Sequence, residues 1–212
     1  MNLLAIESAY DICGTALFAD GVLIGSRETR APRDHNRLLA AYVSDILEQG
    51  GLAASSLDAV AVSSGPGSFT GLRIGMSYAR GLAFGAGIPV VPVPSLPSLL
   101  VGEAESSPEW IVTWSHGTSV YAMPCPGGAA GEIRIMEWRE FVPLAGTAQV
   151  AGYLLDRFTD NHLISWLKAC PSAVKVGKFA LTTDLSQAVK PEEILPDYQH
   201  EFQVKPRKHA DS

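Results

Sequence analysis

The chain has 212 residues, of which 47% are hydrophobic and 18% are charged, and its formal net charge at pH 7 is −6. This composition predicts a sizeable core in one large domain or two small ones, and it argues against wholesale disorder. The negative net charge argues against a protein that grips nucleic acid by itself, because neutralising phosphates requires clustered lysine and arginine.

The cysteines and the N-terminus bear on the cellular compartment. Cys13, Cys125 and Cys170 lie far apart. Their odd number does not suggest a disulfide framework, and no pair has the spacing of metal ligands. The N-terminus lacks a basic segment followed by an apolar one, and no apolar run reaches about 18 residues. We therefore expect a cytoplasmic protein that does not enter a membrane.

The first 28 residues predict three strands in a meander. Residues 2–6 form a compact apolar run, which is typical of a buried strand. Residues 13–19 and 22–28 predict a second and a third strand. Asp20-Gly21 joins these two, and Asp-Gly suits a type I′ hairpin turn because both central residues need a positive φ.

A helix is predicted next, over residues 35–48. Asp34 is a suitable N-cap, and Gly50-Gly51 would end the helix. Two interpretations of its apolar residues remain open: they only pack on the sheet, or some of them face another protein. These residues recur at spacings of three and four and form one stripe: His35, Leu38, Leu39, Tyr42, Val43, Ile46 and Leu47.

A strand over residues 59–62 leads into a glycine-rich turn, Gly65-Pro66-Gly67-Ser68, which opens a second helix. Backbone N–H groups at such a turn, with the positive end of the helix, can hold a phosphate. The same glycines can instead let a helix lie very close to another backbone. The turn lacks the Lys-Ser/Thr pair of a P-loop, and both uses stay open.

The second helix, over residues 71–85, carries small residues at a spacing of four. Glycine inside a helix costs about 0.5–1 kcal/mol relative to alanine, which makes sense if something packs closely against it. Residues 89–93 then predict a fifth strand. The ridge of small residues and the side chains beside it are Gly71, Gly75, Ala79 and Ala83, with Leu72, Arg73, Met76 and Arg80.

Prolines after residue 92 place a domain boundary near residue 98, so that residues 1–98 and 99–212 form two lobes. In the second lobe we expect strands over 110–114, 119–123, 132–138 and 162–165. We also expect a helix over 147–158 and another within 172–188. The order of three strands and a helix thus occurs twice, which suggests a duplicated fold with a degenerate second copy.

Few residues suggest catalysis. Glu7 and Asp11 could in principle bind Mg²⁺ near the end of the first strand. No two histidines stand three to five residues apart, so a helical metal-binding pair is absent, and no Gly-x-Ser-x-Gly elbow occurs. Two helices with wide apolar or small-residue faces suit association better than catalysis.

The string GPGSFTGLRIG over residues 65–75 resembles the signature of the TsaB/YeaZ family, part of the wider group of sugar kinases, heat-shock chaperones and actin. The resemblance includes the opening Leu3-Leu4-Ala5-Ile6-Glu7-Ser8, Ala31-Pro32-Arg33-Asp34-His35, and Gly87-Ile88-Pro89-Val90-Val91. Residues 1–98 match well, and the second half matches mainly at 191–198. The resemblance implies an α/β fold of two ribonuclease-H-like or actin-like lobes, each a mixed sheet with flanking helices.

The resemblance also implies a function. The protein would be a non-catalytic subunit for the threonylcarbamoyladenosine modification of tRNA, and it would bind and activate a TsaD-type transferase through helices of its first lobe. A TsaE-type ATPase would join the complex, tRNA would be contacted only indirectly, and the chain alone would form a homodimer. No intrinsic cofactor is expected, although ATP or ADP could bind within the complex.

The site residues follow from the same resemblance. Candidate nucleotide-binding residues are Glu7, Ser8, Gly65, Gly67 and Ser68. Met76→Glu is expected to abolish partner binding and to leave the fold intact. The partner interface would comprise His35, Leu38, Leu39, Tyr42, Val43, Ile46, Gly71, Leu72, Arg73, Gly75, Met76, Ala79, Arg80 and Ala83.

Two points stay open. The alternative function is an ATP-using phosphotransferase or a protease of the same superfamily, with Glu7, Asp11 and the turn 65–75 as its working parts. The loop 115–121 reads Ser-His-Gly-Thr-Ser-Val-Tyr, where relatives often have Asp-Ala-Arg followed by an acidic residue and Val-Tyr. The role of this loop cannot be carried over from relatives.

Overall fold

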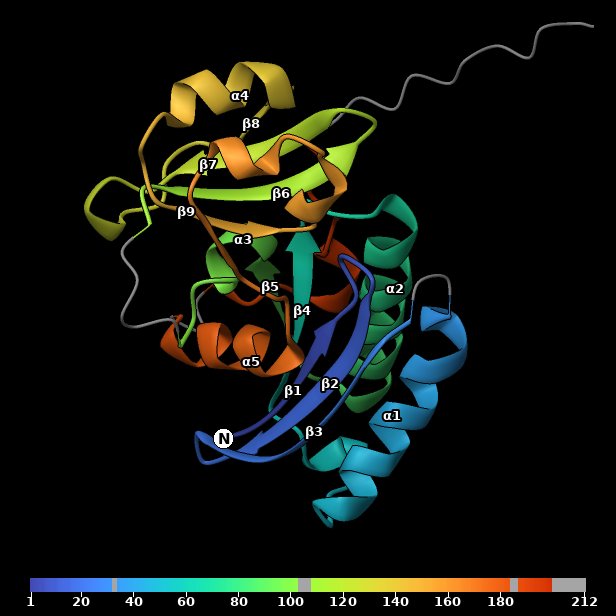
Figure 1. The fold of residues 1–212 in the computed structure, drawn as a ribbon. Coiled ribbons are helices and arrows are strands. Elements are labelled where there is room, and N and C mark those ends of the chain that lie inside the picture. The colour runs from blue at the N-terminus through green and yellow to red at the C-terminus, as the bar shows by residue number, and fades with distance from the viewer. Residues whose placement is uncertain (32–33, 103–107, 184–186, 200–212) are drawn as a thin grey trace, which may run out of the picture.

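The computed structural model describes residues 1–31, 34–102, 108–183 and 187–199. They form two five-stranded mixed sheets with flanking helices (Figure 1), so the predicted two-lobed α/β fold is confirmed. No helix within these ranges is long and apolar enough to cross a membrane. Cys13 and Cys125 are buried, Cys170 is exposed, and all three are free thiols.

The first sheet has the strand order β3-β2-β1-β4-β5. Strands β1 to β3 form the predicted antiparallel meander, and β4 and β5 add to it in parallel. Its strands are β1 (Asn2–Glu7), β2 (Ile12–Ala19), β3 (Val22–Arg30), β4 (Ala59–Gly65) and β5 (Val90–Pro94), and the helices between them are α1 (His35–Gln49) and α2 (Phe69–Ala86).

The second sheet repeats this topology with the order β10-β9-β6-β7-β8. The first three strands are again antiparallel, and the last two add in parallel. Short 3-10 turns between β9 and β10 stand where the first lobe has α2, so this lobe is the reduced copy. Its elements are β6 (Trp110–His116), β7 (Ser119–Pro124), β8 (Arg134–Glu137), α4 (Trp138–Ala145), β9 (Val150–Tyr153) and β10 (Trp166–Lys168).

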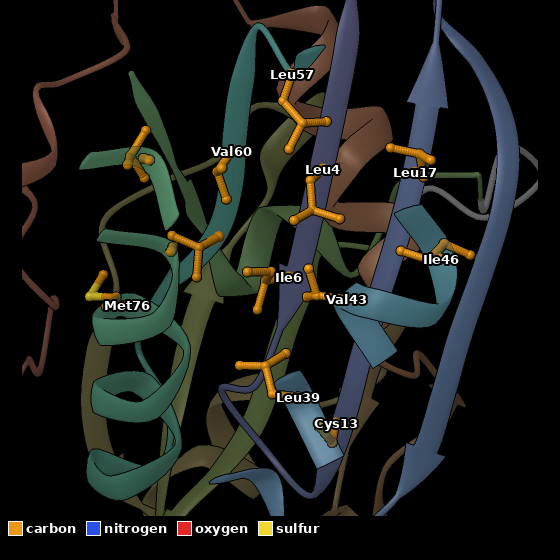
Figure 2. Packing of buried hydrophobic residues seen from close by; sticks show 14 of the residues in the cluster. Leu4, Ile6, Cys13, Leu17, Leu39, Val43, Ile46, Leu57, Val60 and Met76 are labelled. Atoms are coloured by element: carbon orange, nitrogen blue, oxygen red, sulfur yellow. The ribbon is translucent and has the colours of Figure 1, made fainter. Parts of the chain in front are cut away.

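Helices cover both faces of the first sheet (Figure 1). On one face, α1 and α2 enclose a core in which Leu39, Val43 and Ile46 lie against strand residues such as Leu4 and Ile6 (Figure 2). On the other face lies α5 (Ala173–Thr182), although it follows the second lobe in sequence. The domain boundary drawn at residue 98 stays a prediction.

The closing segment also returns to the first lobe. Val189 bridges Val90 at the edge of the first sheet, and Ile194 is buried in the core beneath α1 and α2. The Tyr198 ring lies 4.8 Å from the Phe69 ring at the start of α2. A short helix α3 (Ser95–Ser98) and the turns η1 (Ala54–Ser56), η2 (Pro126–Gly128), η3 (Leu155–Arg157), η4 (Asn161–Leu163) and η6 (Pro191–Glu193) complete the fold.

Two predictions for the second lobe are wrong, and a third differs from the structure only at the ends of the strand. The helix expected over 147–158 is instead β9 followed by a 3-10 turn: all four residues of β9 are buried on a sheet, and Leu154 takes a left-handed φ of 61° that ends the strand. The strand expected over 162–165 begins later, at Trp166. The strand expected over 132–138 is confirmed as β8, but it is shorter and ends at Glu137. The helix α4 begins directly afterwards at Trp138, and it contains Pro143, which obscured it in the sequence.

Candidate functional site

The glycine turn after β4 is packed against its own chain. The Gly65 N–H donates to Ser95 Oγ at 3.1 Å, and the Ser68 N–H donates to the Ala9 carbonyl at 2.6 Å. A Cβ at Gly67 would collide with the backbone and side chain of Ala9. These contacts match the close-packing use of the turn, because two of the backbone donors that a phosphate would need already have partners.

Glu7 and Ser8, the other candidate nucleotide-binding residues, are buried at the end of β1. The Glu7 carboxylate accepts hydrogen bonds from the Ala9 N–H at 2.6 Å and from Ser63 Oγ at 3.3 Å. Burial raises the pKa of Glu7 to about 7, although these two hydrogen bonds oppose the shift. Glu7 is therefore a component of the packed turn rather than a solvated carboxylate.

Asp11 does not share a site with Glu7. Its carboxylate accepts hydrogen bonds from Tyr153 Oη at 2.5 Å and from Arg30 Nε at 2.6 Å. Burial alone would raise the pKa of Asp11, but the Tyr153 and Arg30 contacts outweigh it and hold the pKa below its usual value. Among the described residues, no three His, Cys, Asp or Glu side chains are grouped so that they could hold a metal ion.

The ridge of small residues on α2 packs against another segment of the same chain. A Cβ at Gly71 would meet the Ser8 carbonyl oxygen, and a Cβ at Gly75 would meet Ser8 Oγ. Ser8 Oγ also donates to the Gly71 carbonyl at 3.0 Å. The close approach inferred from the glycines is real, and the neighbour is the turn between β1 and β2.

Burial divides the residues proposed for a partner interface. Leu38 and Tyr42 are half-buried, and Arg73 and Arg80 are exposed. Met76 is 4% exposed and belongs to the same buried cluster as Ile194, so we now expect Met76→Glu to destabilise the fold. The buried members, which contact the core of this chain, are His35, Leu39, Val43, Ile46, Gly71, Leu72, Gly75, Met76, Ala79 and Ala83.

The exposed face of α2 contains residues that sequence reasoning missed. Phe84 is 75% exposed. A Cβ at Gly81 or Gly85 would meet no atom of the described chain within 4 Å beyond the adjoining helix backbone. Ser77, Gly81 and Gly85 have the same spacing of four residues as Gly71 and Gly75. This spacing could have identified the exposed face from the sequence. Near the start of the helix, a hollow of about 350 Å³ is lined by Phe69, Thr70, Arg73, Ile74 and Ser77.

A cleft of about 430 Å³ lies between the lobes, at the N-terminus of α2. Ser68 and Thr70 line one wall, and Trp114, Ser115 and Arg157 line the other. The Arg157 guanidinium lies over the Trp114 ring at 4.2 Å. The atypical loop contributes Ser115, whose Oγ is 3.1 Å from His116 Nδ1. Of the candidate nucleotide-binding residues, only Ser68 lines this cleft.

Comparisons with known proteins agree with the features of the first lobe. Residues 28–124 match the family model described as TsaD, tRNA N6-adenosine threonylcarbamoyltransferase. The tRNA threonylcarbamoyladenosine biosynthesis protein TsaB of Escherichia coli is 40% identical over 102 residues, which are 48% of this chain and 44% of that protein. TsaB of Bacillus subtilis is 33% identical over 99 residues, 47% of this chain and 43% of that protein.

A solved structure matches the whole architecture. The crystal structure of an uncharacterized Pseudomonas aeruginosa protein with similarity to peptidase YEAZ superposes with a TM-score of 0.73. It covers 94% of this chain and 99% of that chain at 24% identity, and so it supports the fold alone. The matches to curated relatives span less than half of those proteins' length. The first half of the chain is thus similar to TsaB proteins and to the TsaD family model, and it contains the turn signature that resembles the TsaB/YeaZ family.

Proposed function

We propose that this chain is a non-catalytic subunit in the biosynthesis of threonylcarbamoyladenosine in tRNA, and that it binds and activates a TsaD-type transferase. The names of its TsaB relatives support the pathway. The binding surface is the exposed face of α2 with the adjoining exposed residues of α1. Activation would be a coupling free energy, because partner binding would favour the active conformation of the transferase.

One observation carries the proposal: the exposed half of α2 has features that packing within this chain does not explain. Gly81 and Gly85 would each cost the helix about 0.5–1 kcal/mol relative to alanine. Unlike Gly71 and Gly75, they have no neighbouring backbone within the described chain that requires glycine. Phe84 stands beside them with three quarters of its surface exposed. A close helix-to-helix contact with another protein would use all three residues.

The family model supports a contact between related helix pairs of the two proteins. The TsaD model matches residues 28–124, a segment that contains both α1 and α2. A TsaD-type protein would therefore present a related helix pair, and the two proteins could meet about a pseudo-two-fold axis. Four helices joined in this way would bury about 1,600 Å², the usual size of a specific interface.

The same surface can pair with a second copy of the chain in the absence of the transferase. In an antiparallel α2–α2 contact centred on Ser77, residue 84 of one copy lies opposite residue 70 of the other. Phe84 would then enter the hollow beside Thr70 and Ile74, and Arg73 would lie over Gly81. A two-fold contact is self-complementary, so each hollow would be filled once.

The test is size-exclusion chromatography with light scattering, using the chain alone and mixed with the TsaD-type protein of the same organism. A heterodimer is expected for the unmodified chain. Phe84→Glu should weaken it at least about 30-fold, since charge would replace an aromatic anchor. The matched control is Leu163→Glu, which places the same charge on a 58% exposed site in the second lobe. An unmodified chain that ignores the transferase overturns the proposal.

The remaining partners follow the same proposal. A TsaE-type ATPase would join the complex, and tRNA would be contacted through the transferase. ATP or ADP would bind within the complex and not to the isolated chain, which the internal hydrogen bonds of Gly65 and Ser68 support. A second candidate, an ATP-using phosphotransferase, is favoured only by the cleft at the N-terminus of α2. Calorimetry with millimolar ATP separates the two: binding by the isolated chain that is lost in Glu7→Ala would favour the second.

A further inference from the structure

The turn between β1 and β2, residues 7–11, is the point at which the two lobes meet α2. Together its residues contact both sheets and α2. Glu7 accepts a hydrogen bond from Ser63 of β4, and Ser8 lies against Gly71 and Gly75 of α2. The Ala9 carbonyl accepts the N–H of Ser68, the N-cap of α2. In Figure 1 this turn lies between the first sheet and the second lobe.

The last two residues of the turn reach into the second lobe. Tyr10 Oη donates to Thr113 Oγ1 of β6 at 3.3 Å, and its ring lies edge-on to Tyr153 of β9 at 5.6 Å. Tyr153 Oη donates to Asp11, whose other carboxylate oxygen accepts from Arg30 of β3. Ala9 and Tyr10 are buried in one apolar cluster with Leu72 of α2 and with residues of the second lobe.

We infer that this turn couples the second lobe to the first half of α2, so that loosening its Tyr153 and Thr113 contacts loosens the helix at Gly71 and Gly75. The physical reason is that the turn is closely packed on both sides. On the α2 side the turn touches glycines at distances that leave no room for a methyl group. On the side of the second lobe it is held by the buried Tyr10 ring and by the hydrogen bond from Tyr153 Oη to Asp11. A shift at one side therefore displaces the other.

The second half of α2 gives an internal reference. A Cβ added at Gly81 or Gly85 would meet no atom of the turn within 4 Å. Loosening the turn should therefore leave amide exchange in this half of the helix unchanged. The consequence for partner binding rests on the proposed function: a change in the cleft between the lobes would alter the orientation of α2, and hence the affinity for the transferase. The mechanical coupling itself does not depend on that function.

Amide hydrogen exchange measured by mass spectrometry tests the coupling. In Tyr153→Phe and in Thr113→Val, exchange over residues 72–76 should become about fivefold faster relative to residues 80–86, as a coupling of about 1 kcal/mol would give. Thr118→Val is the matched control. It removes a threonine hydroxyl that donates to Glu137 at 2.6 Å within the second lobe and touches no part of the turn.

Each outcome decides the inference. Urea denaturation of every variant gives the change in global stability, which accelerates the slowest amides in all elements alike. A selective acceleration of residues 72–76 in both test variants, absent in Thr118→Val, supports the coupling. Uniform acceleration, or none, overturns it. The transferase is then titrated against Tyr153→Phe: failure of the unmodified chain to bind would sink the proposed function and leave the exchange result unaffected.

Discussion

The two halves of α2 differ in what explains their glycines. In the first half, Gly71 and Gly75 are required because the Ser8 backbone and hydroxyl occupy the space of a side chain. In the second half, Gly81 and Gly85 border open space, and the adjacent Phe84 is exposed. Both pairs have the same spacing and the same cost to the helix. A glycine ridge therefore indicates a close neighbour, and only the packing tells whether that neighbour belongs to the same chain.

The largest effect should come from charging the buried side of the helix. Met76→Glu places a carboxylate at a site that is 4% exposed, and it should cost more than about 4 kcal/mol of the free energy of unfolding. Phe84→Glu, on the exposed side, should change that free energy by about 0.5 kcal/mol or less. Urea denaturation of both variants measures the contrast, and equal losses would show that the two sides of α2 are not distinct.

Alanine in the first glycine pair should be nearly as disruptive. Gly71→Ala brings a methyl group onto the Ser8 carbonyl, a backbone atom that cannot rotate away, and should destabilise the fold by about 3 kcal/mol. Thermal and urea unfolding would measure the loss. A neutral Gly71→Ala would mean that the turn can move, which would also weaken the coupling inferred above.

The buried carboxylate under the turn gives a pH-dependent prediction. The folded pKa of Glu7 is about 7, above the value of the unfolded chain, so folding takes up a proton between these two pKa values. The stability of the unmodified chain should therefore fall as the pH rises from about 4.5 to 7, by about 3 kcal/mol in total. Glu7→Gln should lack this loss and be more stable at pH 8. Parallel pH profiles for the two proteins would contradict the buried position.

The smallest effect concerns the second glycine pair. Gly81→Ala should stabilise the isolated chain by about 0.5–1 kcal/mol, because helix propensity improves and no atom is displaced. The same change should weaken binding of the transferase or of a second copy, since the added methyl group would lie in the interface. Calorimetry should show a larger free energy of unfolding and a weaker free energy of binding for the variant. A variant that is both more stable and equally well bound would remove Gly81 from the partner surface.

Much of the first lobe could be predicted because its signals are local. The Asp20-Gly21 turn, the apolar run of β1 and the Gly50 stop each specify a strand, hairpin or helix end without help from distant residues. The second lobe was harder to predict. Residues 150–158 have apolar spacing that suits a helix, but pairing of Val150 and Ala151 with β6 makes them a strand. In α4, Pro143 concealed a helix that packs through Trp138 and Phe141.

The sequence by itself determined the order of the elements in the first lobe, the family signature in the turn and the presence of a close neighbour along α2. These depend on backbone preferences and on spacing along one segment. Only the tertiary structure decided that Met76 is buried, that Ser8 is the neighbour of Gly71 and Gly75, and that Phe84 with Gly81 forms the free surface. The physical reason is that helix periodicity shows which residues share a face, whereas the contents of that face come from segments distant in sequence.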